Sequence, residues 1–122
     1  MFRTIGPVQI DFVTQKSIKQ AKESIVSTIL SQGGNLKVEG SRYITAGFGS
    51  GVKLRLFGIA LSGVECIPRN VIVKLTEINN ETEISITIHI TARISSQLGY
   101  YEKLQQLMYR QALEIKLQFP DA

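Results

Sequence analysis

The chain has 122 residues, of which 43% are hydrophobic and 20% charged, and its formal net charge is +4. This balance excludes a disordered chain and fits one α+β domain over residues 1–122. No apolar run approaches the roughly 20 residues of a membrane-spanning helix, and the first residues lack the apolar stretch of a signal peptide. With a single cysteine, Cys66, the expected compartment is reducing, such as the cytoplasm.

The first predicted elements are a short strand and an amphipathic helix. Residues 8–12 alternate apolar and polar side chains, which is typical of a half-buried strand. Over residues 18–30, apolar side chains recur at steps of three and four, which predicts a helix with one buried face. Thr14 or Ser17 is the expected N-cap, and a Gln three residues after Ser17 completes the spacing of a capping box. Two glycines at 33–34 are expected to end the helix.

Strands are expected through the middle of the chain. Residues 42–48 run into the glycine-rich stretch 47–51, which predicts a hairpin turn into a strand over residues 52–61. A further strand is predicted over residues 71–78. It is followed by Asn79-Asn80, a suitable two-residue turn because asparagine accepts positive φ.

Residues 83–94 give the clearest pattern of the chain. Every second residue is Ile or Ala, and the residues between them are polar or charged. This alternation predicts a strand with one buried face and one face exposed to solvent. A last helix is predicted from about Gly99 or Tyr100 to Leu117. Its main apolar stripe is Tyr101, Leu104, Met108, Ala112, Ile115 and Phe119, widened by Leu107.

The aliphatic face of residues 83–94 needs a cover, and only the two amphipathic helices can supply it. We therefore expect an α+β fold: an antiparallel sheet of about five strands with two helices on one face, in the order β-α-β-β-β-β-α. This order resembles one half of the TATA-box-binding-protein fold and the helix-grip fold of START and Bet v 1-like proteins. The helix-grip resemblance implies a cavity for a small apolar ligand between the sheet and the last helix. The aliphatic side chains on both sides favour a filled core instead.

No set of residues with a catalytic or metal-binding pattern is present. One His and one Cys cannot build a structural zinc site, and His89 is expected on the wet face without an orienting partner. Cys66 is expected under a loop as a small apolar residue, although Arg69 nearby could make its thiol reactive. The stretch 47–51 leads into a strand rather than a helix, which argues against a phosphate-binding loop. We predict no catalytic residue, no metal and no cofactor.

Two surfaces are candidate interaction sites. The last helix carries a second apolar stripe roughly opposite the first, and the outer sheet face carries an exposed aromatic residue; contiguous apolar patches commonly mark interfaces. The expected interface residues are Tyr109, Leu113, Leu117 and Phe57. The leading hypothesis is a non-enzymatic interaction module that forms a homodimer.

Basic side chains on the outer sheet face give a third hypothesis. They are predicted to share this face with Ser and Thr residues, a combination that suits weak binding of nucleic acid or of an anionic membrane surface. The expected anion contacts are Lys53, Arg55, Lys74 and Arg93. A solvated strand face would have the same composition.

Overall fold

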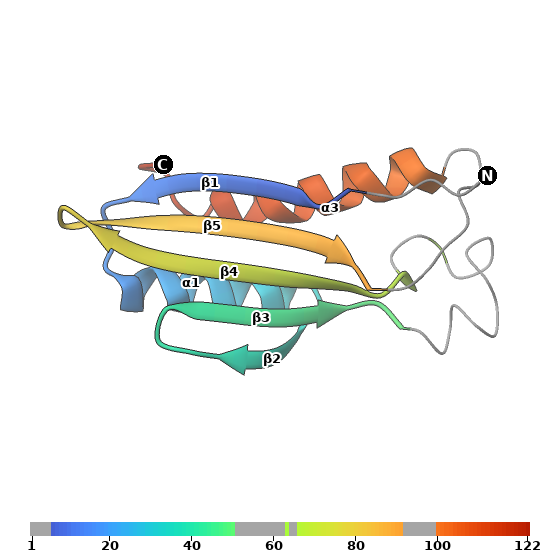
Figure 1. Cartoon of the computed structure of the whole chain (residues 1–122), viewed down its shortest axis with the longest axis horizontal. Coiled ribbons are helices and arrows are strands. Elements are labelled where there is room, and N and C mark those ends of the chain that lie inside the picture. The colour runs from blue at the N-terminus through green and yellow to red at the C-terminus, as the bar shows by residue number, and fades with distance from the viewer. Residues whose placement is uncertain (1–5, 51–62, 64–65, 92–99) are drawn as a thin grey trace.

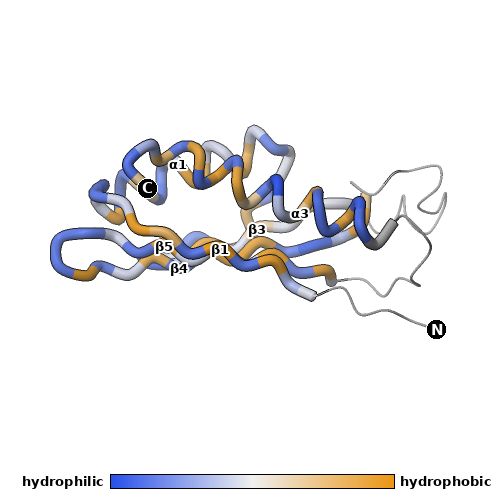
Figure 2. Tube along the Cα trace, turned by 90° about the horizontal axis from the view of Figure 1, so that it is seen from above, coloured by the Kyte–Doolittle hydropathy of each residue, from blue (hydrophilic) through white to orange (hydrophobic). Residues whose placement is uncertain are grey.

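The computed structural model describes residues 6–50, 63, 66–91 and 100–122, which form two layers (Figure 1). The sheet consists of β1 (Val8–Thr14), β2 (Asn35–Glu39), β3 (Tyr43–Phe48), β4 (Arg69–Ile78) and β5 (Glu81–Ile90). The helices are α1 (Ile18–Ser31) and α3 (Tyr100–Lys116). Both helices lie on the same side of the sheet (Figure 2), which confirms the predicted α+β class and element order. No helix within the described ranges is long and apolar enough to cross a membrane.

The start of α1 has the predicted capping box. The Ser17 hydroxyl accepts a hydrogen bond from the Gln20 N–H, and the Gln20 side-chain oxygen accepts one from the Ser17 N–H. The backbone N–H groups of Ser17 and Gln20 have no acceptor within the helix, and these two side-chain contacts satisfy them.

The end of α1 is a Schellman motif. The Gly34 N–H donates to the Ile29 carbonyl and the Gly33 N–H donates to the Leu30 carbonyl. Gly33 has a φ of 86°, the left-handed conformation that this motif favours. The helix thus ends at the predicted glycines, and Gln32 becomes its C-cap residue.

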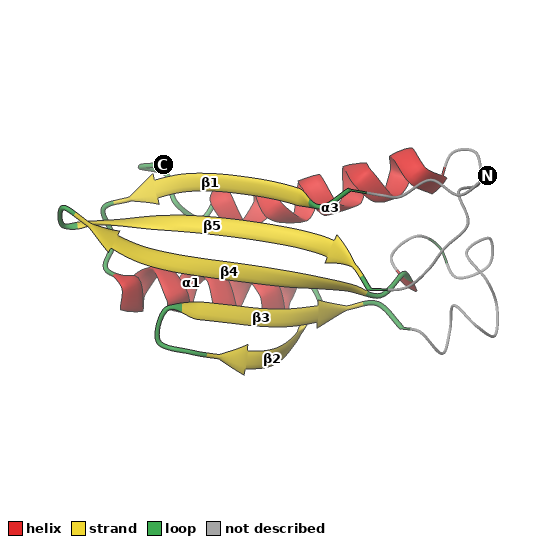
Figure 3. Cartoon of the chain, viewed as in Figure 1, coloured by secondary structure: helices red, strands yellow, loops and turns green. Residues whose placement is uncertain are grey.

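The sheet is antiparallel throughout, in the order β1-β5-β4-β3-β2 (Figure 3). β4 and β5 form a hairpin through the predicted turn, since Ile78 pairs with Glu81 across Asn79 and Asn80. The two asparagines have φ values of 50° and 66°, as a type I′ turn requires. This tight turn lets β5 begin two residues earlier than the predicted start at Glu83. The predicted end at residue 94 lies outside the described residues.

The hairpin partner of β3 differs from the prediction. β2 pairs with one edge of β3 and β4 pairs with the other, so the partner is β2. Residues 52–61, the expected partner, lie outside the described residues. β2 was not predicted because it is a five-residue edge strand with four exposed positions, and its register shifts between Leu36 and Val38. Such a strand lacks the period-two pattern of a half-buried one.

The core lies between the sheet and the helices. Ile84, Ile86 and Ile88 of β5 are fully buried, so the aliphatic ladder is covered as expected. The helices contribute buried side chains spaced by three or four residues, as predicted. Leu30, expected on the buried face of α1, is instead 53% exposed in the last turn of that helix. The fully buried helix residues are Ala21, Ile25, Ile29, Leu104, Met108, Ala112 and Ile115.

Candidate functional site

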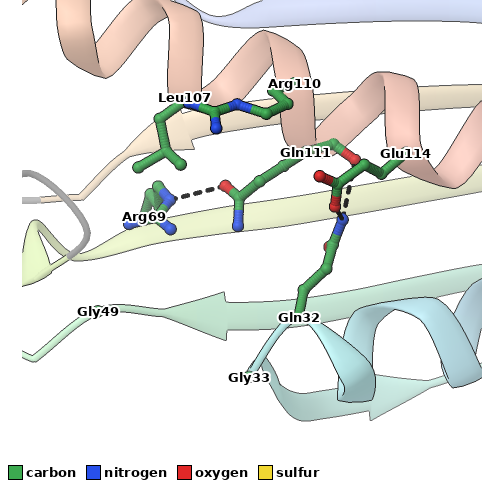
Figure 4. Close-up of a pocket in the computed structure, with 8 residues that line it drawn as sticks. All are labelled: Gln32, Gly33, Gly49, Arg69, Leu107, Arg110, Gln111 and Glu114. Atoms are coloured by element: carbon green, nitrogen blue, oxygen red, sulfur yellow. Dashed lines mark hydrogen bonds between the residues drawn. The ribbon is translucent and has the colours of Figure 1, made fainter.

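A polar cavity of about 260 Å³ lies beside this core. It is formed where the C-terminal end of α1, the end of β3 and the start of β4 meet the middle of α3 (Figure 4). Its lining residues are Gln32, Gly33, Gly49, Arg69, Leu107, Arg110, Gln111 and Glu114. Five of these eight residues have charged or amide side chains, while polar and apolar atoms contribute about equally to the surface of the lining.

The secondary structure explains why these side chains meet. Leu107, Gln111 and Glu114 are spaced by four and three residues, so they share one face of α3. Gln32 reaches this face because α1 ends there. Its Nε2 donates to the Gln111 carbonyl at 3.2 Å and to Glu114 Oε2 at 2.9 Å. The two helices are thus joined by polar contacts beside their apolar interface.

Arg69 is the buried cation of the site, with 3% of its surface exposed. Its Nε donates to Gln111 Oε1 at 2.9 Å and its Nη1 donates to the Ile67 carbonyl at 3.0 Å. The guanidinium also lies 5.3 Å from the centre of the Phe48 ring, a cation–π contact. Burying a charge is costly without such partners, so these contacts hold the guanidinium in one position.

The contact with Arg69 fixes the orientation of the Gln111 carboxamide. Because the carboxamide oxygen Oε1 accepts the hydrogen bond from Arg69, the second polar atom of the carboxamide is the donor Nε2. No described residue accepts a hydrogen bond from this Nε2. Gln111 is 6% exposed, and Nε2 is directed into the cavity (Figure 4). The cavity therefore contains an unpaired donor on a nearly buried side chain.

The same reasoning gives the orientation of Gln32. The Gln32 Nε2 donates to two acceptors, so the second polar atom of its carboxamide is the oxygen Oε1. This oxygen is buried and has no hydrogen-bond partner within the described part of the chain. Most buried polar groups in native proteins are paired with protein or water. The unpaired donor of Gln111 therefore faces the cavity, whereas the unpaired oxygen of Gln32 lies within the cavity wall and has almost no accessible surface.

Charge is distributed unevenly across the cavity. In Figure 4 the guanidinium groups of Arg69 and Arg110 lie on the Leu107 side of Gln111, and the Glu114 carboxylate lies beside Gln32. The lining residues within the described part of the chain include no Ser, Cys, Thr, Lys or His that could act as a nucleophile. These groups are suited to binding a polar molecule by charge and hydrogen bonds.

The predicted interface residues lie elsewhere. Tyr109 on α3 is 52% exposed and Leu113 is half-buried, while Leu117, the predicted last residue of the helix, lies just after its end at Lys116 and is 75% exposed. Phe57 lies outside the described residues. The second apolar stripe of α3 therefore has large exposed side chains, and its use as an interface stays a prediction.

Of the four predicted anion contacts, Lys74 is the one that lies within the described residues. Lys74 is exposed on the open face of the sheet, where its strand neighbours are Tyr43 and Ser85. Lys53, Arg55 and Arg93 lie outside the described residues, so the anion-binding hypothesis stays a prediction.

His89 and Cys66 do not take part in the cavity. His89 is half-buried on the open sheet face, opposite Asn70. Cys66 is half-buried, and its carbonyl accepts a hydrogen bond from the Ser50 N–H. The part of the chain that the structure describes has no group of three or more His, Cys, Asp or Glu side chains placed to hold a metal.

Sequence reasoning missed the cavity, although two residues give a signal for it. Arg69 stands in register with the inward-facing Val71, Val73 and Leu75. Gln111 lies on α3 at the spacing of the buried stripe, between Met108 and Ile115. A charged or amide side chain at an inward-facing position needs buried partners, which marks a polar site.

No protein-family model matches this chain, and no curated protein matches it in sequence.

Proposed function

We propose that this chain is a non-enzymatic binding module that takes a small polar molecule into the cavity between α1 and α3. The observation that carries the proposal is Gln111 Nε2, a donor that faces the cavity and has no acceptor among the described residues. A ligand acceptor at this position would make a hydrogen bond worth about 0.5–1.5 kcal/mol.

The helix-grip resemblance supports this location. Proteins of that fold hold their ligands between the sheet and the last helix, and here Arg69 of β4 and Gln111 of α3 face the same cavity. We propose a helix-grip module on this basis. The charged and amide side chains of the lining favour a ligand that has polar groups over the purely apolar ligand that the resemblance alone implies.

A screen of small polar metabolites by thermal shift, followed by NMR titration, tests the proposal. We expect at least one ligand whose binding is lost in Gln111→Glu, because this change keeps an acceptor for Arg69 and replaces the donor by a carboxylate oxygen. Gln106→Glu, at an exposed position of the same helix, adds the same charge outside the cavity and is the control. Binding that survives Gln111→Glu in every case would contradict the proposal.

Self-association is a second candidate function. The exposed side chains of Tyr109 and Leu117 favour it, because a helix that is apolar on two sides gains stability from a second partner. Light scattering at micromolar concentration is expected to give a dimer for the native chain and a monomer for Leu117→Lys. Gln106→Lys is the matched control and should leave the mass unchanged. A native chain that is monomeric at every concentration rules out this function.

A further inference from the structure

A second group of polar side chains lies on the open face of the sheet, in front of the helices in Figure 1. The register between β2 and β3 shifts between Leu36 and Val38, so Lys37 is the extra residue of a β-bulge. A bulge changes the direction of the side chain that it carries. Here the Lys37 side chain crosses β3, and its Nζ donates to Asn70 Oδ1 on β4 at 2.7 Å.

The path of the Lys37 side chain depends on a glycine. A Cβ placed on Gly47 of β3 would lie 2.7 Å from Lys37 Cε and 3.3 Å from its Nζ, so the lysine occupies the space that a side chain would fill. Lysines on edge strands commonly prevent pairing with another chain. Lys37 lies across the neighbouring strand and not beyond the edge, so edge protection does not explain its position.

The Lys37 ammonium group has unused donors. It carries three N–H donors, and Asn70 accepts from one of them. Lys37 forms no ion pair and no further hydrogen bond with a described residue. Because Asn70 Oδ1 accepts from Lys37, the second polar atom of that carboxamide is the donor Nδ2. Within the described ranges this Nδ2 has no acceptor either, so donors predominate around a positive charge.

The neighbouring side chains on this face add further donors. His89 of β5 pairs with Asn70, and directly opposite residues have Cβ atoms about 4.5–5.5 Å apart. Its imidazole has at least one N–H. The next row along the strands contains the half-buried hydroxyl residues Thr45 and Thr87. The carboxylate of Asp11 is distant, since Asp11 pairs with a residue four positions from His89, about 13 Å along the strand.

We propose that Lys37, Asn70 and His89 form a binding site for the phosphate group of a small molecule. A phosphate monoester has three acceptor oxygens and a charge of about −1.5 to −2 at pH 7, so it can accept hydrogen bonds from three strands at once. A carboxylate or a phosphate diester has fewer free oxygens and a single charge. The site lies on the other side of the sheet from the cavity and shares no residue with it, so the inference does not depend on the proposed function.

Proton NMR of the full chain at constant pH, titrated with methyl phosphate, provides the test. His89 is the single histidine of the chain, so its ring signals report on the site. Dimethyl phosphate and acetate at equal ionic strength are the comparison ligands. We expect methyl phosphate to shift the His89 signals and to bind about tenfold more tightly than either, because it makes more charge-assisted hydrogen bonds. Inorganic phosphate distinguishes the free ion from an ester, and binding of either supports the site.

Two variants test the residues. Lys37→Met keeps an unbranched side chain over Gly47 without the charge, and should weaken methyl phosphate about tenfold. Lys19→Met removes the same charge at an exposed position of α1, on the other side of the sheet, and is its control. Asn70→Asp keeps the acceptor for Lys37 and replaces the donor by a carboxylate oxygen, so it should abolish binding. Asn79→Asp, in the turn at the far end of β4, is the control.

The inference fails if methyl phosphate leaves the His89 signals in place, or if acetate binds as tightly as methyl phosphate. It also fails if dimethyl phosphate binds as tightly, because the ligand would then be a diester such as a nucleic acid backbone. If Lys37→Met and Lys19→Met weaken binding equally, net charge and not this site determines the affinity. None of these results affects the proposed function, because the cavity lies on the helix side of the sheet.

Discussion

Gly49 lines the cavity in a backbone conformation that few other residues adopt. Its φ is 87°, and a Cβ placed on it would lie 2.5 Å from the Ile67 carbonyl oxygen. Two segments of the chain meet beside Gly49, because the Ser50 N–H donates a hydrogen bond to the Cys66 carbonyl at 2.9 Å. Only glycine permits both the conformation and the close approach.

Gly49→Ala is therefore expected to destabilise the fold by about 2–5 kcal/mol, the sum of a left-handed conformation and of overpacking. Gly33→Ala is the control, because Gly33 has almost the same φ, 86°, with no atom within 4 Å of the added Cβ. It should cost about 1–2 kcal/mol, for the conformation alone. Urea unfolding of the two variants measures the difference. If both variants lose the same free energy of unfolding, the close contact between residue 49 and the Ile67 carbonyl adds no steric cost.

At the scale of elements, the strongest sequence pattern corresponds to the best-buried strand. The alternation from Glu83 onward predicts β5 correctly, because a strand with one covered face must alternate. β2 could not be predicted, since its exposed, bulged sequence is not constrained by the core. The cavity could not be predicted either, because Gln32 and Gln111 are 79 positions apart and meet only through the packing of α1 against α3.

The β5 ladder gives a prediction at this scale. Ile86→Ala removes a fully buried side chain that faces the helices and should lower the free energy of unfolding by about 2–5 kcal/mol. Thr76→Ala, at an exposed position of the neighbouring strand, should change it by less than about 0.5 kcal/mol. Denaturant unfolding measures both. Similar values for the two variants would contradict the assigned burial of the ladder.

For the molecule as a whole, the C-terminal tail is tied to the turn between β1 and α1. The Asp121 carboxylate accepts a hydrogen bond from the Gln15 N–H at 2.7 Å and from the Thr14 hydroxyl at 2.9 Å. Lys16 lies over the ring of Phe119, which packs against Phe12. These contacts join the two ends of the described chain and hold α3 along β1.

This tie predicts a pH dependence of stability. The Gln15 N–H chiefly, with the Thr14 hydroxyl and the charge of Lys16, lowers the pKa of Asp121 below its ordinary value of 3.8. A lowered folded-state pKa gives stability that is complete above the ordinary value and is lost as pH falls through the folded-state value. Asp121→Asn should therefore lose less stability on acidification than the native chain. Thermal unfolding across the acid range checks this, and parallel curves for both proteins would refute it.

The central claim is that the cavity between α1 and α3 binds a polar ligand through Gln111. A crystal structure of the chain grown with the tightest ligand from the metabolite screen tests it most directly. We expect ligand density in the cavity, with an acceptor atom within hydrogen-bond distance of Gln111 Nε2. A cavity that contains only water, or a Gln111 side chain turned away from Arg69, would contradict the claim.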